Sequence, residues 1–93
     1  MTYCVTLTPQ AMRDVEGLIP DVRKGVYAAL RRLEDEPRPP GVKVLQGDLT
    51  GNFRLRVGQH RVGYRVDDRA REVIVWHIGD WKRFYERARR RRK

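Results

Sequence analysis

The sequence predicts an α+β fold with an N-terminal strand, a helical hairpin, then an antiparallel sheet with a short C-terminal helix. Two observations predict it. Apolar residues recur every third or fourth position over residues 9–33, whereas from residue 42 their period falls to two. At 93 residues the chain has the length of one domain, so we expect a single domain over 1–93, with a basic tail at about 88–93.

The N-terminal residues predict a strand followed by a short helix. Tyr3, Val5 and Leu7 alternate with polar residues, as in a strand with one buried face. Thr8 places an N-cap hydroxyl before Pro9, which suits the first helical position. The next apolar residues follow helical spacing and form one stripe: Ala11, Met12, Val15, Leu18 and Ile19.

A second helix is predicted to run antiparallel to the first. Pro20 interrupts the first pattern, and Asp21 can assist a new start. The apolar stripe that follows contains Val22, Val26, Ala29, Leu30 and Leu33. Residues 36–41 hold three prolines and cannot continue a helix, because each proline lacks a backbone donor. We interpret them as a connector within the domain.

Four runs of period two follow, and they predict four antiparallel strands. Their apolar residues are Val42 and Val44, then Phe53, Leu55 and Val57, then Val62, Tyr64 and Val66, then Val73 to Ile78. Asp80 can cap a last helix that presents Trp81, Phe84, Tyr85 and Ala88 on one face. With the helical hairpin on one side, the other side of the sheet is expected to be free to hold a ligand.

The net charge of +9 and the pI near 10.6 predict a polyanionic partner. Eight basic residues from Lys82 to Lys93 face only Glu86, so this segment carries +7 of the +9. Blocks of like charge are commonly solvated tails, and we expect this one to add affinity for nucleic acid without adding chemistry.

The N-terminus and the cysteine content predict a cytoplasmic protein. Met1 is followed by alternating sequence rather than the apolar stretch of a signal peptide or membrane span. Cys4 is the one cysteine, so no internal disulfide and no thiolate cluster are expected. We interpret Cys4 as an unreactive packed side chain, and expect no metal and no cofactor.

The most informative segment is a predicted hairpin rich in arginine. Gly58-Gln59 suits a two-residue type II′ turn, which pairs Arg56 with Arg61. That register puts four arginines opposite the apolar side chains: Arg54, Arg56, Arg61 and Arg65. Like charges placed directly across a ladder cost up to about 1 kcal/mol. A phosphate bound between the two guanidiniums would explain the pair, because the arginine fork donates two parallel hydrogen bonds. The alternative is a solvated sheet face.

Three further side chains have an acid–base or stacking chemistry. Histidine is the residue type whose ordinary pKa lies near neutral pH, and the chain has two, His60 and His77. We expect His77 to be a packed strand residue, whereas His60, beside Arg61, is open to either role. Tyr85 lies on the aromatic stripe of the last helix, where it can pack or present a stacking surface.

Residues 45–68 resemble the central motif of the RelE/ParE toxins, roughly L-x-G-x-x-x-G-x-x-R-x-R-V-G-x-x-R-V-x-Y. The resemblance implies a RelE-like fold and a toxin of a type II toxin–antitoxin system. It further implies a metal-independent, ribosome-dependent mRNA endoribonuclease that inhibits translation, with the ribosome, mRNA and an acidic cognate antitoxin as partners. By position it assigns catalytic roles to Arg54, Arg56, Arg61 and Tyr85. Four further residues are expected to bind RNA: Arg65, Lys82, Arg83 and Arg87.

One departure from the family pattern leaves alternatives open. The family commonly reads G-H-R-x-x-x-Y where this chain has Trp81 in place of the arginine, with Lys82 and Arg83 beside it. The resemblance therefore also fits a ParE-like poison of DNA gyrase that catalyses nothing itself. A degenerate, non-toxic module that binds RNA or antitoxin is the third interpretation.

Overall fold

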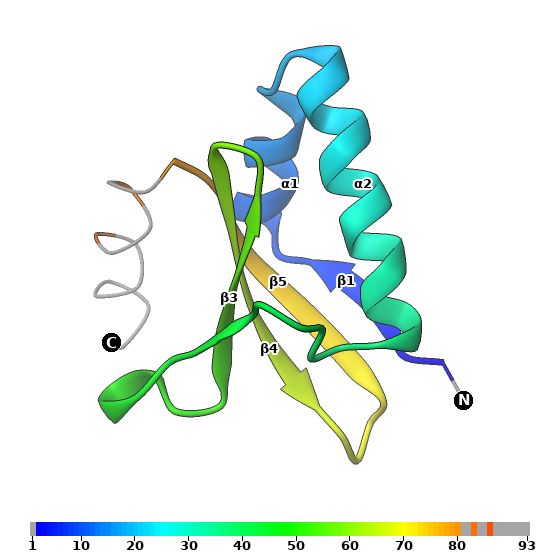
Figure 1. Ribbon diagram of the computed structural model, residues 1–93, viewed down its shortest axis with the longest axis vertical. Helices are drawn as coiled ribbons and strands as arrows, with labels where there is room; N and C mark the ends of the chain where they lie inside the picture. The colour runs from blue at the N-terminus through cyan, green and yellow to red at the C-terminus, as the bar shows by residue number, and fades with distance from the viewer. Residues whose placement is uncertain (1, 81–82, 84–85, 87–93) are drawn as a thin grey trace.

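The computed structural model describes residues 2–80, 83 and 86, and it confirms the predicted α+β class (Figure 1). The elements in chain order are β1 (Cys4–Leu7), α1 (Pro9–Glu16), α2 (Pro20–Asp35), β2 (Lys43–Val44), a 3-10 turn (Gly47–Leu49), β3 (Asn52–Val57), β4 (His60–Asp67) and β5 (Glu72–Gly79). The predicted last helix falls largely on residues outside this description. Its cap is present, because Asp80 Oδ1 accepts the Arg83 amide at 2.9 Å.

The five strands form one sheet in the order β1-β5-β4-β3-β2. The four later strands pair antiparallel, as predicted, whereas β1 pairs parallel to β5, which makes the sheet mixed. Both helices lie on the same side of the sheet and run antiparallel to each other (Figure 1). Neither α1 nor α2 covers the other side of the sheet.

Helix α1 starts as predicted but buries a narrower stripe. Thr8 Oγ1 accepts the Ala11 amide at 3.2 Å, and Pro9 is the first helical residue. Ala11 and Val15 are fully buried. Met12 and Ile19 share the predicted spacing but are 43% and 67% exposed, and the prediction that the helix extends to Ile19 was wrong. The helix makes only about two turns, and Ile19 lies beyond its end, in the loop to α2.

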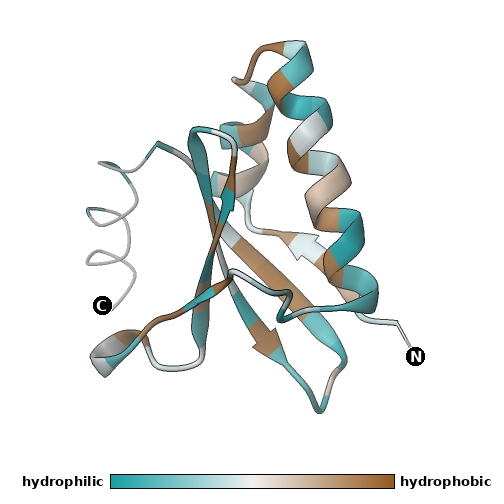
Figure 2. Cartoon of the chain, in the orientation of Figure 1, coloured by the Kyte–Doolittle hydropathy of each residue, from teal (hydrophilic) through white to brown (hydrophobic). Residues whose placement is uncertain are grey.

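Helix α2 covers the centre of the sheet with one apolar face. Val26, Leu30 and Leu33 are buried, and hydrophobic and hydrophilic stretches alternate along the helix (Figure 2). They pack in one cluster with buried sheet residues, which include Phe53, Val62, Tyr64, Val73 and Val75. This core fixes the strands that carry the arginines on their opposite side.

Strand β1 begins later than predicted, and Cys4 corrects an expectation. The Tyr3 amide donates to the Glu34 carbonyl at 2.7 Å, so the chain is held by α2 before the strand starts. Cys4 is exposed rather than packed. Strand alternation places it on the sheet face opposite Val5, away from the helices.

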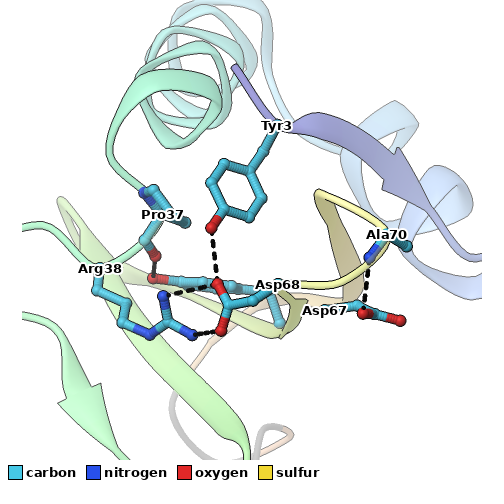
Figure 3. A network of polar contacts seen from close by, with 7 residues as sticks. Tyr3, Pro37, Arg38, Asp67, Asp68 and Ala70 are labelled. Atoms are coloured by element: carbon cyan, nitrogen blue, oxygen red, sulfur yellow. Dashed lines mark hydrogen bonds and ion pairs between the residues drawn. The ribbon is translucent and has the colours of Figure 1, made fainter. Parts of the chain in front are cut away.

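A polar network fastens the proline-rich connector to the sheet (Figure 3). Arg38 donates to both carboxylate oxygens of Asp68, at 3.2 and 2.7 Å, and the Tyr3 hydroxyl donates to Asp68 at 2.6 Å. The Tyr64 hydroxyl donates to the Pro37 carbonyl at 2.8 Å. The hydrogen bond from Arg38, followed by that from Tyr3, holds the pKa of Asp68 below its usual value. The network thus joins the residue before β1, the connector and the β4–β5 turn.

Asp68→Asn is expected to lower the melting temperature at neutral pH, with a gap to the parent that closes in acid. The pKa of Asp68 is lowered by folding, so its contribution to stability is present above the unfolded-state pKa. That contribution is lost as the pH falls through the folded-state pKa. Melting curves of both proteins from neutral pH down to strongly acidic pH measure the gap, with Glu16→Gln as an exposed control. A gap that stays constant with pH would contradict this assignment.

Candidate nucleic-acid interface

The β3–β4 hairpin has the register that the turn residues predict. Val57 pairs with His60, and Arg56 pairs with Arg61. Gly58 has a φ of 60°, the positive value that a type II′ turn requires at its first central position. Glycine tolerates this conformation without steric cost, so the turn sets the register of the strands behind it.

Arg56 and Arg61 lie close together in this ladder. In a two-residue hairpin the residues flanking the turn exchange both backbone hydrogen bonds, so the next pair is a non-hydrogen-bonded one, with Cα atoms about 4.5 Å apart. Arg56 Nε donates to the Gly58 carbonyl at 3.0 Å, and Arg61 Nη1 approaches the His60 carbonyl at 3.4 Å. Both side chains are thereby held near the turn, where their terminal nitrogens can donate to one anion.

We define the arginine face as the four residues that the register places on the side of the sheet opposite the core: Arg54, Arg56, Arg61 and Arg65. Within the β3–β4 ladder, from Asn52 to Arg65, none of the six positions on this side is acidic, and the first acidic residue on this side of β4 is Asp67, at the end of the strand. Lys43 pairs with Arg54 and adds an exposed cation that sequence reasoning missed. The signal was present, because Lys43 stands between Val42 and Val44 in a period-two run.

The far end of this side is covered, which corrects the expectation of a wholly free face. Leu45 and Trp76 are buried in a second small cluster, with Leu49 packed against it. Trp76 Nε1 donates to Asn52 Oδ1 at 3.0 Å, and Asn52 lies directly across from Arg65. The register of β4 and β5 shifts between Gly63 and Tyr64, and this bulge falls at Trp76. The open part of the arginine face is therefore the half near the hairpin turn.

The two histidines lie on opposite sides of the sheet: His77 pairs with Gly63, the partner of Arg54, and so lies on the side of the arginine face. His77 is fully buried, which confirms the interpretation as a packed residue. His60 pairs with Val57, whose side chain packs on the core, so His60 points to the helix side, opposite Arg56 and Arg61. Both histidines line a cavity of about 340 Å³ at the end of β5.

Asp14 is a structural residue beside this cavity that the sequence did not identify. Its carboxylate accepts the Ile78 amide at 3.1 Å, just beyond Val75, the last residue of β5 that pairs with β1. It thereby satisfies a strand amide that has lost its ladder partner.

The remaining candidates lie near the C-terminus. Arg83 is exposed and follows the Asp80 cap. Lys82, Tyr85 and Arg87, like Trp81, lie outside the described residues. In the part of the chain that the structure describes, no helix has the length and apolar content needed to cross a membrane.

The profile of the family described as "ParE toxin of type II toxin-antitoxin system, parDE" matches residues 5–85. The chain belongs to the RelE/ParE superfamily of type II toxins. It is similar to the toxin RelG of Mycobacterium tuberculosis, with 34% identity over 88 residues that cover 94% of this chain and all of RelG.

Solved structures of this superfamily share the fold. The toxin–antitoxin complex RelBE2 of Mycobacterium tuberculosis contains a chain with 31% identity and a TM-score of 0.78, covering 86% of this toxin and 99% of that chain. The archaeal RelE–RelB complex of Pyrococcus horikoshii gives 27% identity and a TM-score of 0.76, covering 86% and 96%. The RelE-like architecture predicted for this toxin is therefore confirmed.

Proposed function

We propose that this toxin is a metal-independent, ribosome-dependent endoribonuclease that cleaves mRNA and so inhibits translation. The observation that carries the proposal is the pairing of Arg56 with Arg61 across the hairpin. Two guanidiniums in direct opposition destabilise a free ladder and gain a favourable role when an anion lies between them. An RNA phosphate supplies that anion.

The chemistry is attack of an RNA 2′-hydroxyl on the adjacent phosphate. Negative charge builds on the phosphorane and then on the leaving 5′ oxygen, which needs a proton. Arg56 and Arg61 stabilise the phosphorane, and Arg54 orients the RNA backbone. Tyr85 acts as the base or as a stacking partner.

Other basic residues hold the RNA in place. Arg65 lies on the arginine face itself, and Lys43, which pairs with Arg54, extends this face onto β2. Lys82, Arg83 and Arg87 supply further phosphate contacts from the C-terminal segment. Their contribution is electrostatic, so binding weakens as salt is added.

An acidic antitoxin is the proposed inhibitory partner. The net charge of +9 steers an anionic polypeptide to the toxin. Two proteins with which the toxin shares its fold were solved as toxin–antitoxin complexes.

The second candidate function is poisoning of DNA gyrase without catalysis. It is favoured by Trp81, which stands where the family commonly has an arginine. A guanidinium is also too basic to accept a proton readily, so the arginines alone do not supply a general base.

Brief induction in cells separates the two functions. The proposed nuclease is expected to leave mRNA ends that are phased with the ribosome, with DNA supercoiling unchanged. Mapping of mRNA 5′ ends, with supercoiling measured on plasmid DNA from the same cells, provides both readouts. Gyrase-linked DNA breaks together with intact mRNA would reject the nuclease.

A further inference from the structure

A groove separates helix α2 from the end of β3. It has a volume of about 280 Å³. Its apolar lining consists of Ala28, Ala29, Pro39, Pro40, Leu55 and Val57. The groove lies on the helix side of the sheet, whereas the arginine face lies on the other side, and Arg56 lines the groove from the end of β3.

The groove is open because β2 stops short. β2 pairs with β3 only at Arg54 and Phe53. Before Lys43 the chain turns away, with the Val42 amide donating to the Pro39 carbonyl at 3.2 Å. Proline cannot donate to a ladder, so residues 39 and 40 cannot extend β2 along β3.

The open edge exposes the backbone of one arginine. The Asn52 carbonyl accepts the Leu45 amide at 3.0 Å, so alternate residues of β3, starting from Asn52, direct their backbone groups away from β4. By this alternation the backbone amide and carbonyl of Arg56 point toward the part of the β3 edge along which β2 does not extend. An extended polypeptide can pair with them as a short added strand.

The charges of the groove select an acidic occupant. Its two charged lining residues are Arg32 and Arg56, and no carboxylate lines it. Nucleic acid fits less well, because single-stranded RNA is bound on aromatic platforms and no aromatic side chain lines this groove. A peptide whose apolar side chains are flanked by carboxylates therefore matches both the apolar lining of the groove, which forms its floor, and the two arginines at its rims.

We propose that this groove docks an acidic, apolar segment of the inhibitory partner, whose carboxylate engages Arg56. Arg56 belongs to both the groove and the proposed phosphate clamp, so the occupant withdraws one of the two guanidiniums from RNA. The occupant can then inhibit RNA cleavage without covering the whole arginine face. The inhibition of RNA cleavage rests on the proposed function, whereas the docking of the segment in the groove does not.

Peptides selected from a phage-displayed library of random linear peptides test the docking. The target is the Arg61→Ala protein, which lacks the proposed clamp, so binding is measured apart from any nuclease activity. Selection is expected to enrich peptides with carboxylates beside apolar residues. Arg32→Glu and Ala28→Trp should weaken their binding by about tenfold or more, since one reverses a rim charge and the other fills the floor.

Neighbouring positions on α2 provide matched controls. Arg31 and Tyr27 line a different groove, between α2 and β1, so Arg31→Glu and Tyr27→Trp should leave peptide binding unchanged. Circular dichroism checks that all four variants fold. Peptides that bind the Arg32→Glu and Ala28→Trp variants as tightly as they bind the Arg61→Ala protein would overturn the proposal.

A cleavage assay then separates this inference from the proposed function. With intact Arg61, an enriched peptide should stop mRNA cleavage by the parent and fail to stop cleavage by the Ala28→Trp protein. Peptide binding without any mRNA cleavage would reject the nuclease and keep the docking site. Cleavage that selected peptides never inhibit would reject the docking inference and keep the nuclease.

Discussion

Arg61→Ala is expected to reduce mRNA cleavage on programmed ribosomes by about 100-fold or more while leaving the melting temperature unchanged or slightly raised. The loss follows because one of two opposed guanidiniums that stabilise the phosphorane is removed. Stability is retained because Arg61 lies across from Arg56, and removing a like charge from this pair takes no volume from the core. Single-turnover cleavage and thermal melting measure the two effects.

Two other substitutions serve as controls for the effect of Arg61→Ala on cleavage. Arg69→Ala removes one positive charge from the exposed β4–β5 turn, so it should leave cleavage near the parental rate. Arg61→Lys keeps the charge but loses the planar fork, and should restore only part of the activity. A variant lacking Arg61 that melts well below the parent would show a structural role. Parental cleavage by a stable variant would remove the clamp from the mechanism.

Tyr64→Ala is expected to lower the free energy of unfolding by about 3–5 kcal/mol, the usual cost of deleting a large buried aromatic ring. Tyr64 is fully buried, and its ring stacks on Phe53 with the centroids 5.5 Å apart. Burial raises the pKa of its hydroxyl above the ordinary value, so the group stays protonated and donates to the Pro37 carbonyl. Urea denaturation measures the loss.

Tyr64→Phe isolates the hydrogen bond from the ring. It should cost about 1–2 kcal/mol, because the Pro37 carbonyl loses its donor while the packing remains. Tyr27→Phe, at a tyrosine that is 38% exposed, should change stability by less than about 0.5 kcal/mol. Equal stability of parent and Tyr64→Phe would show that the connector is held by other contacts.

The sequence predicted the hairpin well because its determinants are local. Gly58 fixes the turn, the period of two fixes the faces, and together they give the Arg56–Arg61 pair without knowledge of the rest of the chain. The Thr8 cap was predictable for the same reason. The arginine face was thus predicted in its residues and orientation.

What the sequence did not predict depends on contacts between distant segments. The parallel pairing of β1 with β5 depends on where the helical hairpin returns the chain. The cluster of Trp76 with Leu45 needs a bulge in β5, which no local pattern indicates. Asp14 meets Ile78 only through the packing of α1 against the end of β5. Met12 follows the same helical spacing as the buried residues of α1 but is exposed, because spacing alone does not say how much of a short helix the sheet covers.

The lengths of the two outer strands bear on whether molecules of this toxin aggregate. β1 has four residues and β2 has two. Just before β1, the Tyr3 amide donates to the Glu34 carbonyl of α2, so this amide is not available to pair with another chain. Long, flat outer strands recruit other chains into intermolecular sheets, whereas short ones that carry lysine, such as Lys43, offer little template. The long strands β4 and β5 lie inside the sheet, and where β5 continues beyond its pairing with β1 the Ile78 amide donates to the Asp14 carboxylate. The toxin can therefore remain dispersed during the interval in which no partner covers it.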